Sequence, residues 1–99
     1  MDCNRVCLTG KFAELGPLRY SPAGIPIMEF RLTHVSSQIE GAIERKIEFE
    51  ISCIAIADTA VGVSKLQAGN QVKLEGFLAK KGSRNGEIVF HTNHIELIG

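Results

Sequence analysis

Alternation of apolar and polar side chains is the feature of this sequence that most constrains its fold. From residue 46 to residue 53, Ile, Phe and Cys side chains occupy every second position, with Lys, Glu and Ser side chains between them. A period of two is typical of a β-strand that buries one face and exposes the other. We therefore predict five strands, at residues 4–12, 27–35, 43–54, 72–79 and 87–98, the last with a break near Thr92–Asn93.

Turn-forming residues separate the predicted strands. Gly, Pro, Asn and Ser are concentrated in short stretches, and these residue types mark turns and hairpin loops. The stretches lie at residues 16–17, 21–26, 67–70 and 80–86. Ser36–Gly41 is also expected to be a polar connection. Residues 55–66 are rich in Ala and lack strand alternation, so they are predicted as either a short helix or an irregular cover.

This order of elements describes a small barrel. Five antiparallel strands with an extra element between the third and fourth are typical of the OB-fold, with a small sandwich as the alternative. Gly10 and Gly76 lie inside predicted strands and favour the barrel, because closure requires bent strands. We predict an all-β, five-stranded OB-fold barrel that spans residues 1–99 as one domain. Phe30 and Phe49 lie in apolar alternation and are assigned to its core.

Composition limits the location and the binding class. The chain has 11 basic and 11 acidic side chains, so strong nonspecific nucleic-acid binding is not favoured, although a local basic patch is still compatible with binding. The uncharged run Ile51–Ala57 is far shorter than the roughly 20 residues that span a bilayer. No signal peptide is evident, so a cytoplasmic protein without membrane contact and with reduced cysteines is expected.

The loop at residues 80–86 is the first candidate binding site. Lys80, Lys81 and Arg84 lie within it and no acid does. Cations at a hairpin tip can contact a phosphate backbone, and the loop between the last two OB-fold strands commonly contacts oligonucleotides. A merely solubilising hairpin tip explains the same composition equally well.

Two further places could contact nucleic acid. Arg19 could bind phosphate beside Tyr20, whose ring could stack on a base or, as the sequence slightly favours, fold onto the barrel. Phe77 lies on the polar face of its strand and is a candidate stacking platform. The alternative for Phe77 is that a bend at Gly76 turns its ring into the core.

Catalytic and metal-binding patterns are absent from the sequence. His91 and His94 are three residues apart, which places them on opposite faces of an unbroken strand and makes a poor metal pair. His34 is expected at a strand end or an interface. The cysteines lack ligand spacing, and no phosphate loop or nucleophile elbow occurs. We therefore expect no enzymatic activity, no metal and no cofactor.

Several short motifs resemble bacterial single-stranded DNA-binding proteins of the SSB type and, more narrowly, the primosomal replication protein N (PriB) family. The opening Asn4-Arg5-Val6-x-Leu8-x-Gly10 and the segment Arg19–Gly24 carry the wider resemblance. Glu75-Gly76-Phe77, Asn85-Gly86 and the ending His91-x-x-x-Ile95-Glu96-Leu97-Ile98 carry the narrower one. The sequence contains no Trp, on which SSB proteins stack bases, and it ends without their Gly/Pro/Gln-rich tail.

The resemblance implies a homodimeric, non-enzymatic OB-fold protein that binds single-stranded DNA at stalled bacterial replication forks on the nucleoid. It implies that the protein stimulates the PriA helicase and helps to recruit the next helicase-loading factor. By position it assigns DNA contacts to Lys80, Lys81, Arg84, Arg31, Arg19 and Lys46.

Two departures from the family pattern weaken the expected DNA binding. Glu48 stands where the family has a strand aromatic, and the hairpin after Gly86 is about two residues shorter. Two alternatives therefore stay open: a protein-interaction module with little DNA binding, and a tail-less SSB-like binder that acts alone.

Overall fold

The computed structural model describes residues 2–82 and 86–99. Its long strands confirm the order of the five predicted strands, and the short strand Arg19–Tyr20 is an addition that the sequence did not predict. The Ala-rich segment, for which a helix and an irregular cover were both left open, contains a short helix. In chain order the strands and the helix are β1 (Val6–Leu15), β2 (Arg19–Tyr20), β3 (Pro26–Glu40), β4 (Ile43–Ile56), α1 (Asp58–Ser64), β5 (Gln71–Lys80) and β6 (Ile88–Leu97).

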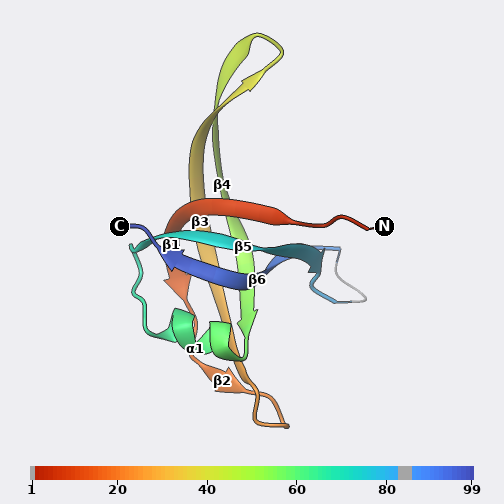
Figure 1. The fold of residues 1–99 in the computed structure, drawn as a ribbon, viewed down its shortest axis with the longest axis vertical. Helices are drawn as coiled ribbons and strands as arrows, with labels where there is room; N and C mark the ends of the chain where they lie inside the picture. Colours follow the sequence, from red (N-terminus) through yellow and green to blue (C-terminus); the bar gives the residue numbers. More distant parts are fainter. Residues whose placement is uncertain (1, 83–85) are drawn as a thin grey trace.

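The five long strands form the closed barrel of an OB-fold, as predicted (Figure 1). The sheet order is β1-β5-β6-β4-β3-β2, and a second pairing of β1 with β3 closes it. β1 achieves this by pairing with β5 from Val6 to Lys11 and with β3 from Lys11 to Leu15. β4 and β6 pair in parallel, whereas the other pairings described are antiparallel.

Close strand crossings explain the two glycines inside strands. A Cβ atom at Gly10 would lie 2.4 Å from the Thr33 carbonyl oxygen, where β1 crosses β3. At Gly76 it would lie 1.8 Å from the His91 carbonyl oxygen. Beside Gly76 the register between β5 and β6 shifts, and Asn93 is the extra residue. This β-bulge lies where a break was predicted near Thr92–Asn93, but β6 continues through it from Ile88 to Leu97 without a break.

The core fills the barrel with the inward side chains of the alternating strands. Phe12 and Phe30 meet edge to face with ring centroids 5.2 Å apart, a favourable aromatic geometry. α1 contributes Ala60 and Val63, which are both fully buried. The remaining buried apolar residues of the cluster are Met28, Leu32, Cys53, Ala55, Val72, Leu74 and Phe90.

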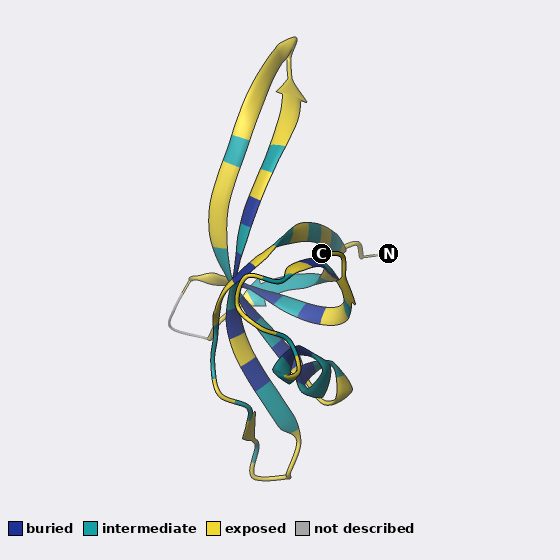
Figure 2. Ribbon diagram, turned by 90° about the vertical axis from the view of Figure 1, so that its left-hand side faces the viewer, coloured by how far each residue is buried: buried dark blue, intermediate teal, exposed yellow. Residues whose placement is uncertain are grey.

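A long β3–β4 hairpin extends beyond the barrel, and here the sequence prediction was wrong. Ser36–Glu40, expected as a loop, continues β3 and pairs with β4 up to Glu40 and Ile43. Gly41 makes the tight turn with a φ of 60°. Figure 1 shows the hairpin standing clear of the barrel, and Figure 2 shows that most of its outer half is exposed. Polar residues on both strands misled the prediction, because a two-stranded ribbon has no core to bury.

Phe49 and His34 also differ from expectation. Phe49 is 39% exposed, because its position on β4 lies where the hairpin leaves the barrel. Its ring packs on His34, with centroids 5.0 Å apart. His34 is buried in the middle of β3, not at a strand end. Its Nδ1 lies 2.7 Å from the Thr9 carbonyl oxygen and its Nε2 lies 2.8 Å from Ser36 Oγ.

Candidate nucleic-acid interface

Two of the predicted cations converge on one hollow of the outer barrel face, the cation hollow. Arg31 reaches it from β3, and Lys81 reaches it from the residues that follow β5. These two positions are 50 residues apart in the chain and are brought together by barrel closure. The other lining residues are Glu14, Gly16, Glu29, Phe30, Ser52, Cys53 and Val89.

Glutamates from adjacent strands balance these cations. Arg31 forms an ion pair with Glu50 and donates a 2.9 Å hydrogen bond to Ser52 Oγ. The Glu50 carboxylate raises the pKa of the Arg31 guanidinium. Arg19 pairs with Glu29 at 3.4 Å, with both side chains more than half exposed. Exposed pairs of this kind contribute little to stability, so an incoming phosphate can compete for the cation at low cost.

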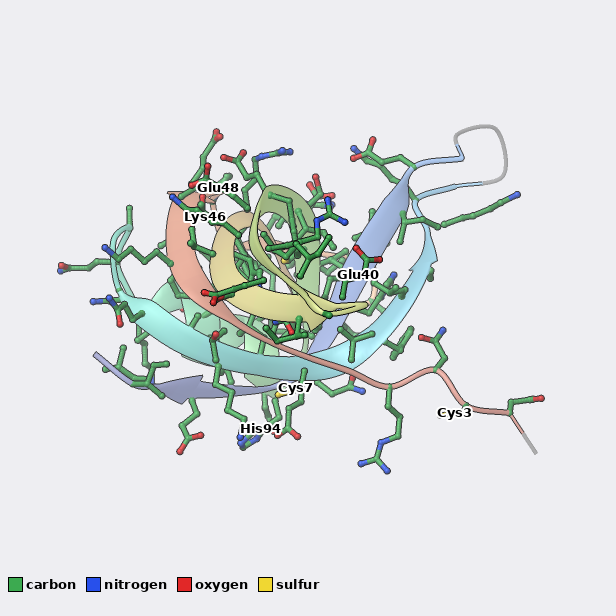
Figure 3. The ribbon with its side chains drawn as sticks, turned by 90° about the horizontal axis from the view of Figure 1, so that it is seen from above. Cys3, Cys7, Glu40, Lys46, Glu48 and His94 are labelled. Carbon is green, nitrogen blue, oxygen red and sulfur yellow. The ribbon has the colours of Figure 1, made fainter. Side chains whose placement is uncertain are left out.

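The remaining predicted cations are spread over different places. Lys46 lies on the protruding hairpin beside Glu48, on the same side of β4 (Figure 3). Lys80 ends β5 and is exposed. Arg84 lies outside the described residues. The structure therefore joins Arg31 with Lys81 and leaves Lys46 at a separate position beside an acid.

Phe77 points outward, and the bulge at Gly76 does not turn it into the core. Its ring is partly exposed and stacks on the ring of His91, with centroids 4.9 Å apart and planes 8° apart. Tyr20, by contrast, is 61% exposed on β2 and does not fold onto the barrel as the sequence slightly favoured.

The histidine prediction needs correction. Phe77 faces His91 across the strands and Glu75 faces His94, so both histidines lie on the outer face. The extra residue Asn93 reverses the expected alternation between them. Within the described residues, no group of three or more His, Cys, Asp or Glu side chains could hold a metal ion.

The cysteines differ in burial, since Cys53 is buried and Cys7 is exposed. Burial raises the pKa of the Cys53 thiol to about 12, so it is protonated and unreactive at neutral pH. Cys7 is exposed on β1 and lies in the same shallow hollow as His94 (Figure 3). No helix among the described residues is long and apolar enough to cross a membrane.

Sequence reasoning missed the partners of the cations. Glu50 and Ser52 contact Arg31 because the β3–β4 register places residue 31 opposite residue 52. The alternation showed that these side chains face outward, but the register that makes them neighbours depends on the hairpin turn at Gly41. His91 was missed as the partner of Phe77 for the same reason.

Comparison with known proteins agrees with this fold. The model of a family described as another single-strand binding protein family matches residues 4–94. The replication restart protein PriB of Nitrosomonas europaea is 41% identical, over 96% of this chain and 88% of its own length. That of Bordetella pertussis is 31% identical, over 89% and 82%.

Solved structures show the same likeness. PriB from Ralstonia solanacearum is 29% identical and superposes with a TM-score of 0.90, covering 97% of this chain and 98% of that one. The single-stranded DNA-binding protein from Thermus aquaticus shares the fold at 21% identity and a TM-score of 0.78, over 98% of this chain and 50% of that one. The predicted resemblance is confirmed: this chain belongs to the PriB family of single-strand binding proteins.

Proposed function

We propose that this chain binds single-stranded DNA during replication restart and positions it for the PriA helicase and the helicase-loading factors. The observation that carries this proposal is the convergence of Arg31 and Lys81 on the cation hollow, with Lys81 directly following β5 at the start of the candidate loop at residues 80–86. In an OB-fold, this loop and the neighbouring strand face commonly contact oligonucleotides. A binding rather than a catalytic role also agrees with membership in a single-strand binding family.

In the proposed mechanism, DNA phosphates replace glutamate carboxylates as the ion-pair partners of the arginines. DNA phosphate displaces Glu50 from Arg31 and Glu29 from Arg19, so part of the electrostatic attraction is spent on breaking existing ion pairs. Glu48 repels the backbone near Lys46. The affinity for DNA is therefore modest, and contact with the helicase lengthens the time that both proteins stay bound to the DNA.

Binding to oligo(dT) at two salt concentrations, with and without the helicase, tests this proposal. Phosphate contacts by Arg19, Arg31 and the three loop cations give a log–log salt slope of about −3.5, so affinity should fall roughly a hundredfold between 50 and 200 mM salt. Adding PriA helicase should raise the apparent affinity. Absence of DNA binding at 50 mM salt would contradict the proposal.

The acid-paired cations favour a second candidate, a protein-interaction module with little DNA binding. In the same titration this module would bind the helicase but not oligo(dT). A tail-less SSB-like binder would bind oligo(dT) without any effect of the helicase. The two alternatives therefore give opposite results.

The predicted homodimer is also part of this proposal. From Val6 to Gly10, β1 pairs with β5 along one edge, and no strand of the described chain pairs along the other. An apolar stripe on the hairpin, here called the hairpin stripe, consists of Ile43, Ile47 and Phe49. These side chains lie on the same face of β4 as the buried core residues Cys53 and Ala55. A two-fold partner that pairs along β1 would cover both features, and two-fold dimers are the commonest assembly.

Phe49→Glu should break this dimer without unfolding the barrel. Phe49 is partly exposed in the single chain, so a charge there is tolerated by the monomer but is costly when a partner covers it. Sedimentation velocity should show a wild-type dimer at micromolar concentration and a dissociation constant at least tenfold higher for the variant. A monomeric wild type, or an unchanged dimer, would reject this interface.

A further inference from the structure

A pair of stacked rings projects from the outer face at the seam of β5 and β6. Phe77 and His91, here called the ring ridge, face each other across the strands with nearly parallel planes. Both side chains are partly exposed. A ring pair held parallel on a rigid sheet presents a flat aromatic surface that can extend the stack by one more ring.

The bulge fixes the geometry of the ring ridge. Gly76 and Asn93 lie where the register shifts, and the missing Cβ of Gly76 lets β5 approach the His91 carbonyl. The next residue on β5 is Phe77, which therefore lies directly opposite His91. The ring ridge is held by backbone pairing on both strands, so little side-chain freedom is lost when a ligand binds.

A hollow lies against the ring ridge on its β4 side. It combines apolar side chains from β4 with polar groups from α1 and β6, a lining suited to a flat ring with a polar edge. Thr92 is buried, and its Oγ1 has no hydrogen-bond partner among the described residues. Besides the two rings, the lining residues are Ile54, Ile56, Thr59, Thr92 and Asn93.

This ring hollow follows the cation hollow on the same face. On β4, Ser52 lines the cation hollow and Ile54 lines the ring hollow. On β6, Val89 lines the cation hollow and His91 lines the ring hollow. Each step is two residues, so the side chains stay on one face and advance by about 7 Å. A chain whose phosphate lies on Arg31 or Lys81 can therefore place its next base against the ring ridge.

We propose that the ring ridge and its hollow form a base-stacking site for single-stranded DNA. This inference rests on the proposed DNA binding and adds a base contact to its phosphate contacts. Ile54 and Ile56 cover the edge of the base, while the Asn93 side-chain amide lies at its rim. The Thr59 hydroxyl donates a 3.1 Å hydrogen bond to the Asn93 carbonyl oxygen and so helps to hold this rim in place. Stacking tolerates any base, so the site adds affinity without sequence preference.

Replacement of either ring tests the site. His91→Leu and Phe77→Leu should each weaken binding to oligo(dT) about tenfold, as loss of one base–aromatic stack does. His91→Phe keeps a ring and should bind within about twofold of the wild type. The matched control is His94→Leu, which removes the same ring from the same strand outside the ring hollow and should leave affinity unchanged.

An abasic oligonucleotide of the same length separates this inference from the proposed function. It keeps the phosphates and lacks the bases, so the wild type and both ring variants should bind it equally, with unchanged salt slopes. Ring variants that match the wild type on oligo(dT), or that lose abasic binding equally, overturn the base-stacking site. A wild type that binds neither oligonucleotide overturns DNA binding itself.

The three histidines provide a second measurement that does not depend on substitutions. In imidazole-detected NMR, oligo(dT) should shift the His91 ring resonances, while buried His34 stays unchanged as an internal reference. The abasic oligonucleotide should not shift His91. Equal shifts with both oligonucleotides would contradict stacking at this ridge.

Discussion

Replacing Lys80, Lys81 and Arg84 together by Ala should weaken binding to single-stranded DNA at least tenfold. The three cations lie within seven residues that contain no acid, and Lys81 lines the cation hollow together with Arg31. Each lost phosphate contact should also flatten the log affinity versus log salt plot by about 0.7. The loss should be similar for different base sequences, because phosphate contacts carry no sequence information.

Fluorescence anisotropy at several salt concentrations measures both quantities. Lys65→Ala, directly after α1, is a control for the loss of one surface charge away from the cation hollow and should change neither affinity nor slope. Thermal unfolding of the triple variant should match the wild type, since Lys80 and Lys81 are exposed and surface substitutions usually change stability little. Unchanged affinity and slope in the triple variant would show that the loop is only a solvated hairpin tip, and the interaction-module alternative would then be preferred.

Gly76→Ala should have the largest effect on stability, lowering the free energy of unfolding by about 3 kcal/mol or more. Its added methyl group would lie 1.8 Å from the His91 carbonyl oxygen and 2.8 Å from Phe90 Cε1. A paired backbone carbonyl in a barrel seam cannot move alone, so β5 and β6 must separate locally. Overpacking by one methyl group already costs about 1–3 kcal/mol where side chains can adjust.

Urea unfolding provides the measurement, and α1 provides the control. Gly62 lies inside that helix, and the nearest atom to an added Cβ there is 4.0 Å away. Gly62→Ala should therefore raise stability by about 0.5–1 kcal/mol, because Ala is the better helix former. A Gly76→Ala variant with the wild-type midpoint would mean that the close strand approach is not present in solution.

The local sequence pattern predicted most of the fold, but the strand register, which determines which site residues are neighbours, could not be predicted from it. The alternation around Ile47 and Ile51 and the mid-strand glycines identified strands and bends correctly, whereas the Ala-rich segment left a helix and an irregular cover open. The pattern cannot show where a strand leaves the barrel, so Phe49 was assigned to the core although it remains 39% exposed in the single chain, where its ring packs on His34.

The site residues show the same limit. Arg31 and Lys81 were identified as cations, but their convergence follows from barrel closure between segments far apart in the sequence. One added residue, Asn93, moved His94 to the same face as His91. A β-bulge has no sequence signal in the partner strand, and its effect on every following side chain cannot be read from periodicity alone.

The seam between β4 and β6 has a consequence for how the chain folds. Cys53 to Ala55 pair with Phe90 to Thr92, and β1 pairs with residues of β5 that lie 60 to 70 positions later in the chain, from Lys11 with Gln71 to Val6 with Gly76. The β3–β4 hairpin joins consecutive segments and can form early during synthesis, whereas the barrel cannot close until the last strand has left the ribosome. Until then the hairpin carries unpaired edges and uncovered apolar side chains, so this small domain folds late and is most exposed to aggregation while it is being made.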